Sequence, residues 1–273
     1  MTTHPGLRRS VAVDEVMGTR ASAHVILHDG VPEAVAEGAV EAALDSLHQA
    51  DRRFSPFRDD SQVSAIARGE LSLDDAHPDV REVEAACRDA LARTDGRFSA
   101  WWRGWFDPTG YVKGWAVDQA VERHLLALLE VDGVAAVGLN VGGDLRVATA
   151  PGADWTWRVG IADPLHHGEV LATLELVDGA VATSGTAERG AHVVDPRTGE
   201  RALSVLSATV VSATLAHADL WATTALVAGI DDLSWIAAAG TRSGLLAGSE
   251  GRVRRWAGSV EVALVDGADA TTV

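Results

Sequence analysis

The sequence predicts an α+β protein rather than a doubly wound α/β protein, and three observations carry this prediction. Residues 32–133 contain several segments in which apolar residues have the spacing that is typical of helices. The chain from residue 134 onward is instead rich in short β-branched segments separated by turn residues. Helices and strands therefore come partly in blocks, without the regular strand–helix alternation of a parallel sheet.

The first half begins with strands and continues with helices. Residues 9–28 combine alternating and β-branched stretches and predict two strands that turn near Met17-Gly18-Thr19. Residues 32–51 have a proline near the start and helical apolar spacing, which predicts a long helix. A loop with a short helix after Asp60 follows, and residues 78–96 predict a helix that begins at a proline and ends at a glycine.

The chain returns to strands after one aromatic loop and one helix. Residues 96–114 are rich in glycine and aromatic residues and predict a loop, whereas residues 116–133 predict a helix. Two more helices are expected over residues 217–229 and 231–240. The segments expected to form strands share β-branched residues and flanking turn residues: 134–149, 155–164, 170–179, 180–185, 203–213, 243–248, 251–258 and 259–267.

Composition and charge restrict the classes of partner. The 273-residue chain has a formal net charge of −16, which argues against nucleic acid as a partner, because phosphate contacts need basic patches. No apolar run approaches the roughly 18 residues of a transmembrane helix. The N-terminal segment has no apolar stretch and the single cysteine, Cys87, lies in a predicted helix, so we expect neither a signal peptide nor a lipid anchor. The expected location is the cytoplasm.

Asp219 and Thr223 are polar residues in the otherwise apolar helix predicted over residues 217–229. They are four positions apart, so they share one helix face, one turn above the other. A buried carboxylate is unfavourable unless it is paired, hydrogen-bonded or bound to a metal. No cysteine or histidine pair has the spacing of zinc ligands, whereas a carboxylate with hydroxyl and carbonyl oxygens suits Mg²⁺.

The segment FDPTGYVKGWAVD, residues 106–118, places Asp107, a glycine turn at Gly110 and Lys113 at the head of a helix. Lys113 is the only lysine of the chain, which favours a position where a compact ammonium is needed and a planar guanidinium will not serve. Helix N-termini and nearby lysines favour anions, phosphates especially. The residues alone therefore indicate a Mg²⁺-dependent enzyme that acts on a phosphate or a nucleotide.

Two further segments carry possible binding groups. GLNVGGDL, residues 138–145, is neither a Rossmann nor a Walker motif, and we interpret it as a glycine hairpin. ATSGTAERGAHVVDPRTGE, residues 182–200, gathers small hydroxyl residues with Arg189, which could hold an anion, and His192. A structural and a functional role for His192 are equally compatible with this segment.

The order of these motifs resembles the ApbE family of FAD:protein FMN transferases. The resemblance covers about residues 15–230 and rests on VMGT, FSPFRDDSQVSAI, GRFSAWW, FDPTGYVKGWAVD, GLNVGGDL, ATSG, HVVDPRTGE and ADLWATTAL. It implies an ApbE-like, T-fold-related architecture of mixed or antiparallel sheets packed by helices. It also implies a single flavin transferase domain over residues 1–273, in which two interleaved α/β lobes of about residues 9–135 and 136–265 are possible.

The resemblance implies a reaction as well. Members of the family cleave FAD with Mg²⁺ and attach FMN through a phosphoester bond to a Thr or Ser of an acceptor flavoprotein, with release of AMP. FAD would then be the substrate, Mg²⁺ the cofactor, and the partner a protein with an FMN-binding domain. A Mg²⁺-dependent FAD pyrophosphatase giving FMN and AMP, and a non-catalytic FAD-binding or carrier protein, are the alternatives.

Position by position, the resemblance implies roles for individual residues. Asp219 and Thr223 match magnesium ligands, and the backbone carbonyl of Gly110 matches a third. His192 matches a proposed base for the acceptor hydroxyl, so His192 and Asp219 are the expected catalytic residues. The expected contacts to FAD are Met17, Phe57, Phe98, Ser99, Asp107, Lys113 and Val193.

Overall fold

Antiparallel strands form the central layer of the protein. The computed structural model describes residues 6–185 and 193–262. Within these ranges nine strands form one sheet in the order β1-β2-β3-β4-β7-β8-β9-β10-β11, and two form a separate hairpin, β5-β6. Every described neighbouring pair is antiparallel. The strands are β1 Leu7–Val16, β2 Thr19–His28, β3 Val134–Val141, β4 Asp144–Thr149, β5 Trp157–Ala162, β6 Val170–Leu176, β7 Gly179–Gly185, β8 Val205–Ser212, β9 Ser243–Gly248, β10 Val253–Ala257 and β11 Val260–Val262.

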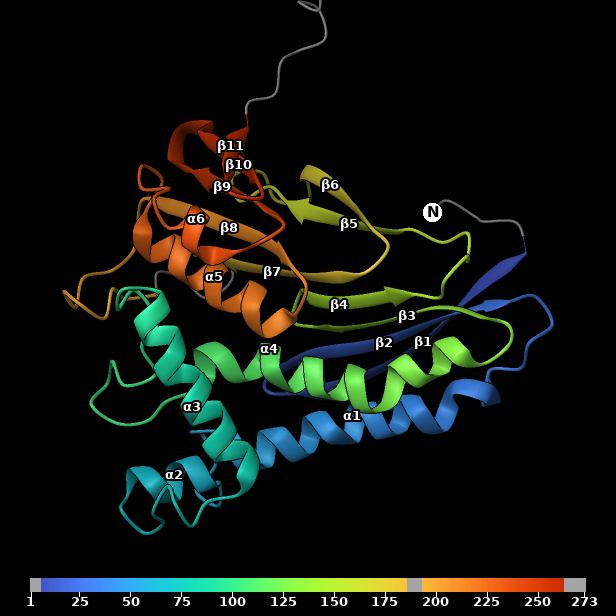
Figure 1. Ribbon diagram of the computed structural model, residues 1–273, viewed down its shortest axis with the longest axis horizontal. Helices are drawn as coiled ribbons and strands as arrows, with labels where there is room; N and C mark the ends of the chain where they lie inside the picture. Colours follow the sequence, from blue (N-terminus) through green and yellow to red (C-terminus); the bar gives the residue numbers. More distant parts are fainter. Residues whose placement is uncertain (1–5, 186–192, 263–273) are drawn as a thin grey trace, which may run out of the picture.

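Helices pack along this sheet, with α1 and α4 beside β1–β3 and α5 beside β7 and β8 (Figure 1). The α-helices are α1 Ala34–Phe54, α2 Gln62–Ala67, α3 Pro78–Arg93, α4 Thr109–Ala120, α5 Leu215–Ala228 and α6 Ile236–Ala239. Helix α4 continues as a π-helical segment, Val121–Leu125, and a 3₁₀ segment, Leu126–Glu130. Helices α1 to α4 lie in the chain between β2 and β3, which are direct neighbours in the sheet. The α+β class expected from the sequence is confirmed.

The two faces of the sheet have separate cores, because side chains alternate along each strand. On β2, Val25 and Leu27 belong to the large core shared with the helices. Between them, Ile26 points to the opposite face and joins a smaller core with Trp157 of β5. The hairpin β5-β6 therefore covers the sheet face that the helices leave free, and the helical face is the one on which α4 and α5 meet.

The prediction of a loop over residues 96–114 is wrong in its second part. Helix α4 begins at Thr109, directly after Pro108. A proline just before the first helical residue is harmless, because the N–H that it lacks would have no partner within the helix. Gly110 and Gly114, two of the glycines that make this segment resemble a loop, are helical, and Lys113 lies in the second turn of α4.

The prediction of a helix over residues 231–240 is also largely wrong, since α6 has only four residues. The carboxylate of Asp232 accepts hydrogen bonds from the backbone N–H and the hydroxyl of Ser234, and the Trp235 indole donates to the Asp232 carbonyl. Local bonds of this kind compete with the helical pattern at its start.

Strand β3 spans the boundary between residues 135 and 136 at which the sequence analysis divides two lobes. It pairs with β2 on one side and with β4 on the other. The sheet is thus continuous across that position. Among the helices of the described ranges, none has the length and apolarity needed to span a membrane.

Candidate active site

Helices α4 and α5 approach each other closely enough to bring polar groups from both into contact. A Cβ added at Gly114 would lie 2.7 Å from the Cα of Ala216, so only glycine allows this approach. The carboxylate of Asp118 accepts hydrogen bonds from the backbone N–H groups of Leu215 and Ala216, each at 2.8 Å. Asp118 thereby binds free N–H groups at the start of α5 and fixes the register of the two helices.

Asp118 is itself held from the sheet. Its Oδ1 lies 2.8 Å from Nη1 of Arg146, which belongs to β4. Burial raises the pKa of the Asp118 carboxyl, while the two backbone hydrogen bonds and Arg146 act in the opposite direction. One carboxylate thus connects α4, α5 and β4 around the site.

The centre of the site is a cluster of Lys113, Asp219 and Asp144. The ammonium of Lys113 lies 3.2 Å from Oδ2 of Asp219 and is in direct contact with Oδ2 of Asp144. Both carboxylates are buried, with 6 % of Asp219 and 2 % of Asp144 exposed. One ammonium is therefore shared by two buried carboxylates from α5 and β4.

Asp144 reaches this position because a tight turn joins β3 to β4. Val141 and Asp144 are paired across a turn whose two residues, Gly142 and Gly143, have φ values of 60° and 92°. Two successive residues in this region are typical of a type I′ turn, where glycine is strongly favoured. The other carboxylate oxygen of Asp144, Oδ1, accepts a hydrogen bond of 2.8 Å from the Thr183 N–H of β7.

Thr223 lies one helical turn after Asp219 on α5 and contacts a hydroxyl at the end of β7. Its Oγ1 is 3.2 Å from the Ser184 Oγ. Thr183, the preceding residue of β7, points to the opposite face of the sheet, where its hydroxyl is 2.9 Å from that of Thr209 on β8. The face of α5 that carries Asp219 and Thr223 therefore meets the end of β7, and the predicted pair of magnesium ligands lies at this contact.

The donor set fits a hard cation such as Mg²⁺. Oδ2 of Asp219 is buried and, among the described residues, accepts no hydrogen bond, although the Lys113 ammonium is 3.2 Å away. The ion pair thus lacks hydrogen-bond geometry. A buried carboxylate oxygen without such a bond is unfavourable and has capacity for a ligand. The Thr223 hydroxyl adds a second oxygen donor of the kind that Mg²⁺ prefers.

Gly110 lies in the first turn of α4, three positions before Lys113. A Cβ added there would lie 3.1 Å from Cε2 of Phe98. The Phe98 side chain is almost fully buried, so its ring supports the helix at Gly110. Of the predicted residues, the structure therefore brings Gly110 together with Phe98, and Lys113 together with Asp219.

Asp107 is buried at the start of α4. Its Oδ1 accepts hydrogen bonds from the Thr109 hydroxyl at 2.7 Å and from the Thr109 N–H at 3.2 Å. Its Oδ2 lies 3.4 Å from Nη1 of Arg103. Ser99, in the preceding loop, accepts a hydrogen bond of 3.1 Å from the Trp101 N–H. Asp107 and Ser99, two of the predicted polar contacts to FAD, thus have local structural partners.

Met17 occupies the turn between β1 and β2 with an unusual backbone. Its φ is 54° and that of Gly18 is 69°, in a two-residue turn closed by the pair Val16 and Thr19. A positive φ in a residue other than glycine is uncommon, and such strain gathers at functional sites. The Thr19 side chain also meets the β3–β4 turn, 2.9 Å from a Cβ placed on Gly142. The Met17 turn therefore adjoins the turn that positions Asp144.

Among the described residues, no contact links the remaining predicted site residues to the cluster of Lys113, Asp219 and Asp144. The Phe57 side chain is 89 % exposed in the loop between α1 and α2. Val193 is partly buried and packs against the main core. His192 and Arg189 lie outside the described residues.

Sequence reasoning missed Asp144 and Asp118 as site residues. Both lie inside motifs that drew attention for other reasons, the glycines of GLNVGGDL and the lysine of FDPTGYVKGWAVD. The available signal for Asp144 was its position directly after two glycines, which fix the direction of the next side chain. Asp118 gave no signal in the sequence, because its partners are backbone groups distant in the chain.

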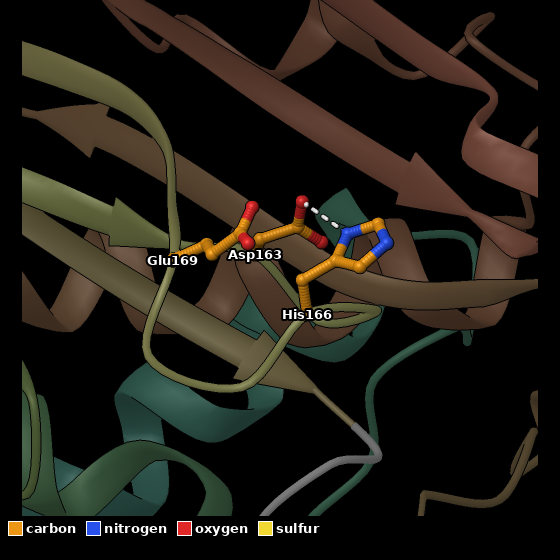
Figure 2. A group of neighbouring side chains, drawn as sticks. All are labelled: Asp163, His166 and Glu169. Carbon is orange, nitrogen blue, oxygen red and sulfur yellow. Dashed lines mark hydrogen bonds and ion pairs between the residues drawn. The ribbon is translucent and has the colours of Figure 1, made fainter.

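A second group of possible metal ligands lies on the connection between β5 and β6. Donor atoms of Asp163, His166 and Glu169 all lie within 4.8 Å of one another (Figure 2). Oδ2 of Asp163 is 3.1 Å from His166 Nδ1, and its Oδ1 accepts a 2.8 Å hydrogen bond from the Leu165 N–H. The turn itself thus uses the Asp163 carboxylate, and both other side chains are exposed. We assign this group no function.

The fold and the site define a class of protein. Residues 103–245, more than half of the chain, match the ApbE family. The chain belongs to the ApbE family.

Known proteins of this family show the extent of the similarity. The FAD:protein FMN transferase of Rhodobacter capsulatus is 37 % identical over 140 residues, which are 48 % of this chain and 26 % of that protein. The FAD:protein FMN transferase of Escherichia coli strain K12 is 32 % identical over 127 residues, which are 43 % of this chain and 35 % of that protein. The matched segment thus spans about a quarter to a third of the length of these relatives.

Solved structures extend the similarity of fold over most of the chain. The ApbE protein of Thermotoga maritima has a TM-score of 0.76 and 21 % identity, covering 91 % of this chain and 97 % of that one. The flavin transferase ApbE of Vibrio cholerae has a TM-score of 0.70 and 17 % identity, covering 93 % and 98 %. The ApbE-like fold expected from the sequence is confirmed.

Proposed function

We propose that the protein is a Mg²⁺-dependent FAD:protein FMN transferase. Membership of the ApbE family supports this function. The observation that carries it is the buried contact of Lys113 with Asp219, whose Oδ2 accepts no hydrogen bond from the described residues. A cationic side chain beside a carboxylate oxygen that accepts no hydrogen bond is suited to hold a phosphate and a metal ion next to each other.

Asp219, Thr223 and the backbone carbonyl of Gly110 would hold Mg²⁺ in this proposal. When bound, Mg²⁺ neutralises negative charge on the pyrophosphate oxygens of FAD. Asp219 and Gly110 lie on two helices that Asp118 and Gly114 keep in a fixed register. Ligands held in this way need little ordering when the ion binds, which favours affinity.

Lys113 would bind FAD through its positive charge, and Asp107 would bind it through hydrogen bonds. The ammonium acts as a compact positive charge on a phosphate oxygen, and Asp107 accepts hydrogen bonds. The exposed ring of Phe57 is free to stack on an aromatic ring of the ligand. The other proposed contacts are Met17, Phe98, Ser99 and Val193.

His192 would act as the general base. Its imidazole accepts the proton of the acceptor Thr or Ser hydroxyl while the hydroxyl oxygen forms a bond to the FMN phosphorus. The bond from that phosphorus to the AMP oxygen breaks, and AMP leaves. Because His192 lies outside the described residues, this role rests on the HVVDPRTGE motif alone. We place the reaction in the cytoplasm, as the sequence analysis expects.

The full chain should be incubated with FAD, Mg²⁺ and an acceptor that contains an FMN-binding domain, followed by intact-mass analysis and AMP quantification. The proposal expects an FMN-sized mass gain of the acceptor, an equal amount of AMP, and loss of both in Asp219→Asn. AMP and free FMN without a mass gain would replace transfer by pyrophosphatase activity. FAD recovered bound and intact would indicate a carrier.

A further inference from the structure

We propose that Asp144 is a positioning residue that competes with Asp219 for the Lys113 ammonium, so that Asp219 keeps the capacity to bind a divalent cation. This inference rests on the proposed function, because it assumes a metal site at Asp219. Lys113 has two carboxylate partners, and its contact with Asp144 is the closer one. Without Asp144, the same ammonium would have Asp219 as its only partner among these contacts.

Asp144 is well suited to fix the ammonium. It is 2 % exposed and is the first residue of β4 after the glycine turn. Its Oδ1 is occupied by the Thr183 N–H at 2.8 Å, which leaves Oδ2 for Lys113. The lysine side chain is flexible, whereas the carboxylate is anchored by the Thr183 N–H independently of Lys113, so Asp144 sets the position of the ammonium and not the reverse.

The charges of the three side chains explain why this position matters. Asp144, Asp219 and Lys113 together carry a formal charge of −1, which attracts a divalent cation. If Asp144 were neutral, Lys113 and Asp219 would form a neutral buried pair, and a metal ion would have to displace the ammonium. Charges interact strongly in a water-poor site, so this competition would weaken metal binding substantially.

A purely structural role for Asp144 can be separated from this one. Asp144→Asn keeps a carbonyl oxygen that can accept the Thr183 N–H, and removes only the charge that faces Lys113. The contact between β4 and β7 should therefore persist, and near-ultraviolet circular dichroism of the tryptophans would report a native fold. Asp144→Glu keeps the charge and serves as the conservative variant.

The test is Mn²⁺ binding without FAD, measured from the electron paramagnetic resonance signal of the free ion. Asp144→Asn should raise the Kd by about tenfold or more, because a charge contact in a buried cluster is lost. Asp144→Glu should stay within about threefold of the wild type. In Asp144→Asn/Lys113→Met the competing ammonium is absent and the three positions again carry a formal charge of −1, so the Kd should return close to that of the wild type.

Two results would overturn the proposal. A wild-type Kd in Asp144→Asn would show that Asp144 does not affect the metal site. A double variant that binds as weakly as Asp144→Asn would show that Asp144 acts as a metal ligand or through the fold. The proposed function is tested separately. It is wrong if the wild-type protein neither binds Mn²⁺ nor releases AMP from FAD. If the wild-type protein releases AMP while one of the two results above is found, only the proposal for Asp144 is wrong.

Discussion

Three buried carboxylates shape the site, and they differ in the partners that each one has. Asp219 has Lys113 within 3.2 Å, yet its Oδ2 accepts no hydrogen bond from the described residues. Asp144 and Asp118, in contrast, are bonded through both carboxylate oxygens. The three residues therefore differ in what their replacement should do.

Asp219→Asn should lower AMP release from FAD by at least about 100-fold at a fixed Mg²⁺ concentration, because a neutral amide no longer offsets the charge of the ion. The free energy of unfolding in urea should change by no more than about 1 kcal/mol, because Lys113 keeps its contact with Asp144. Unchanged AMP release would remove Asp219 from the metal site.

Thr223→Val should raise the Mg²⁺ concentration for half-maximal AMP release by about fivefold or more. This is the effect expected when the ion loses its contact with one hydroxyl group. Thr224→Val is the matched control on the same helix. The Thr224 hydroxyl is fully buried and donates to the Leu220 carbonyl at 2.8 Å, within α5. The control should therefore alter stability but not the Mg²⁺ dependence, and equal Mg²⁺ shifts in both variants would contradict the ligand role.

The sequence could single out Asp219 and Thr223 because both lie on one helix, where spacing alone determines the shared face. It could not single out Asp144 in the same way. The partners of Asp144 are a side chain on α4 and a backbone N–H on β7, and no local pattern relates these segments. The site roles that the family resemblance implies, including that of His192, stay predictions.

At the scale of elements, the close packing of α4 on α5 positions the site. Gly114→Ala should reduce the free energy of unfolding by about 1–3 kcal/mol, because the new Cβ would lie 2.7 Å from the Cα of Ala216 and 2.8 Å from the carbonyl oxygen of Leu215. Metal affinity should fall as well, since the helices that carry Lys113 and Asp219 would separate.

Gly38→Ala is the control for this variant. Gly38 is exposed on α1, and a Cβ there would meet nothing within 4 Å. Alanine should stabilise this helix by about 0.5–1 kcal/mol, because glycine is the poorer helix former. Urea denaturation measures whether the free energy of unfolding falls in Gly114→Ala and rises in Gly38→Ala. A Gly114→Ala protein as stable as the wild type would contradict the close approach of α4 and α5.

The start of α4 shows why the sequence predicts the helices and strands only in part. Its glycines and the preceding proline are typical of a loop, and a contact with another helix explains Gly114. The long helix α1 and the strands around Met17 were predictable, because their apolar spacing agrees with their burial. Local pattern thus suffices where burial has a simple period, and fails where tertiary contact determines the residue.

At the scale of the whole molecule, the buried strand β2 makes stability depend on pH. Burial, with the nearby positive charge of Arg9 as the smaller cause, lowers the pKa of His24 from 6.5 to about 4. Between these pH values the unfolded chain binds a proton at His24 and the folded protein does not. The free energy of unfolding should therefore fall as the pH decreases from about 6.5 to about 4.

His24→Gln checks this pH dependence. The urea midpoint of the wild-type protein should fall between about pH 7 and about pH 5, and that of His24→Gln should fall less, because the variant has no group that titrates at this position. His28→Gln, which changes an exposed histidine at the end of the same strand, should behave as the wild type. Identical pH profiles of wild type and His24→Gln would contradict the prediction.

The order of the strands in the sheet could not be predicted from the sequence, although most of the strands themselves were predicted. Patterns of apolar residues give the position of a strand and its buried face, but they do not give its neighbours. The pairing of β2 with β3 joins segments on either side of all four helices of the first half. Nothing local in β2 specifies a partner so far along the chain.

This pairing also has a consequence for the order of folding. The β3–β4 turn closes over two residues, whereas β2 can join β3 only after residues 29–133 have been bridged. Closing the longer loop carries the larger entropic cost, and distant pairings form slowly. In pulse-labelled hydrogen exchange during refolding, the β3 amides that bond to β4 should be protected before those that bond to β2. Simultaneous protection of both sets would mean that the β1–β2 hairpin joins the sheet from the beginning.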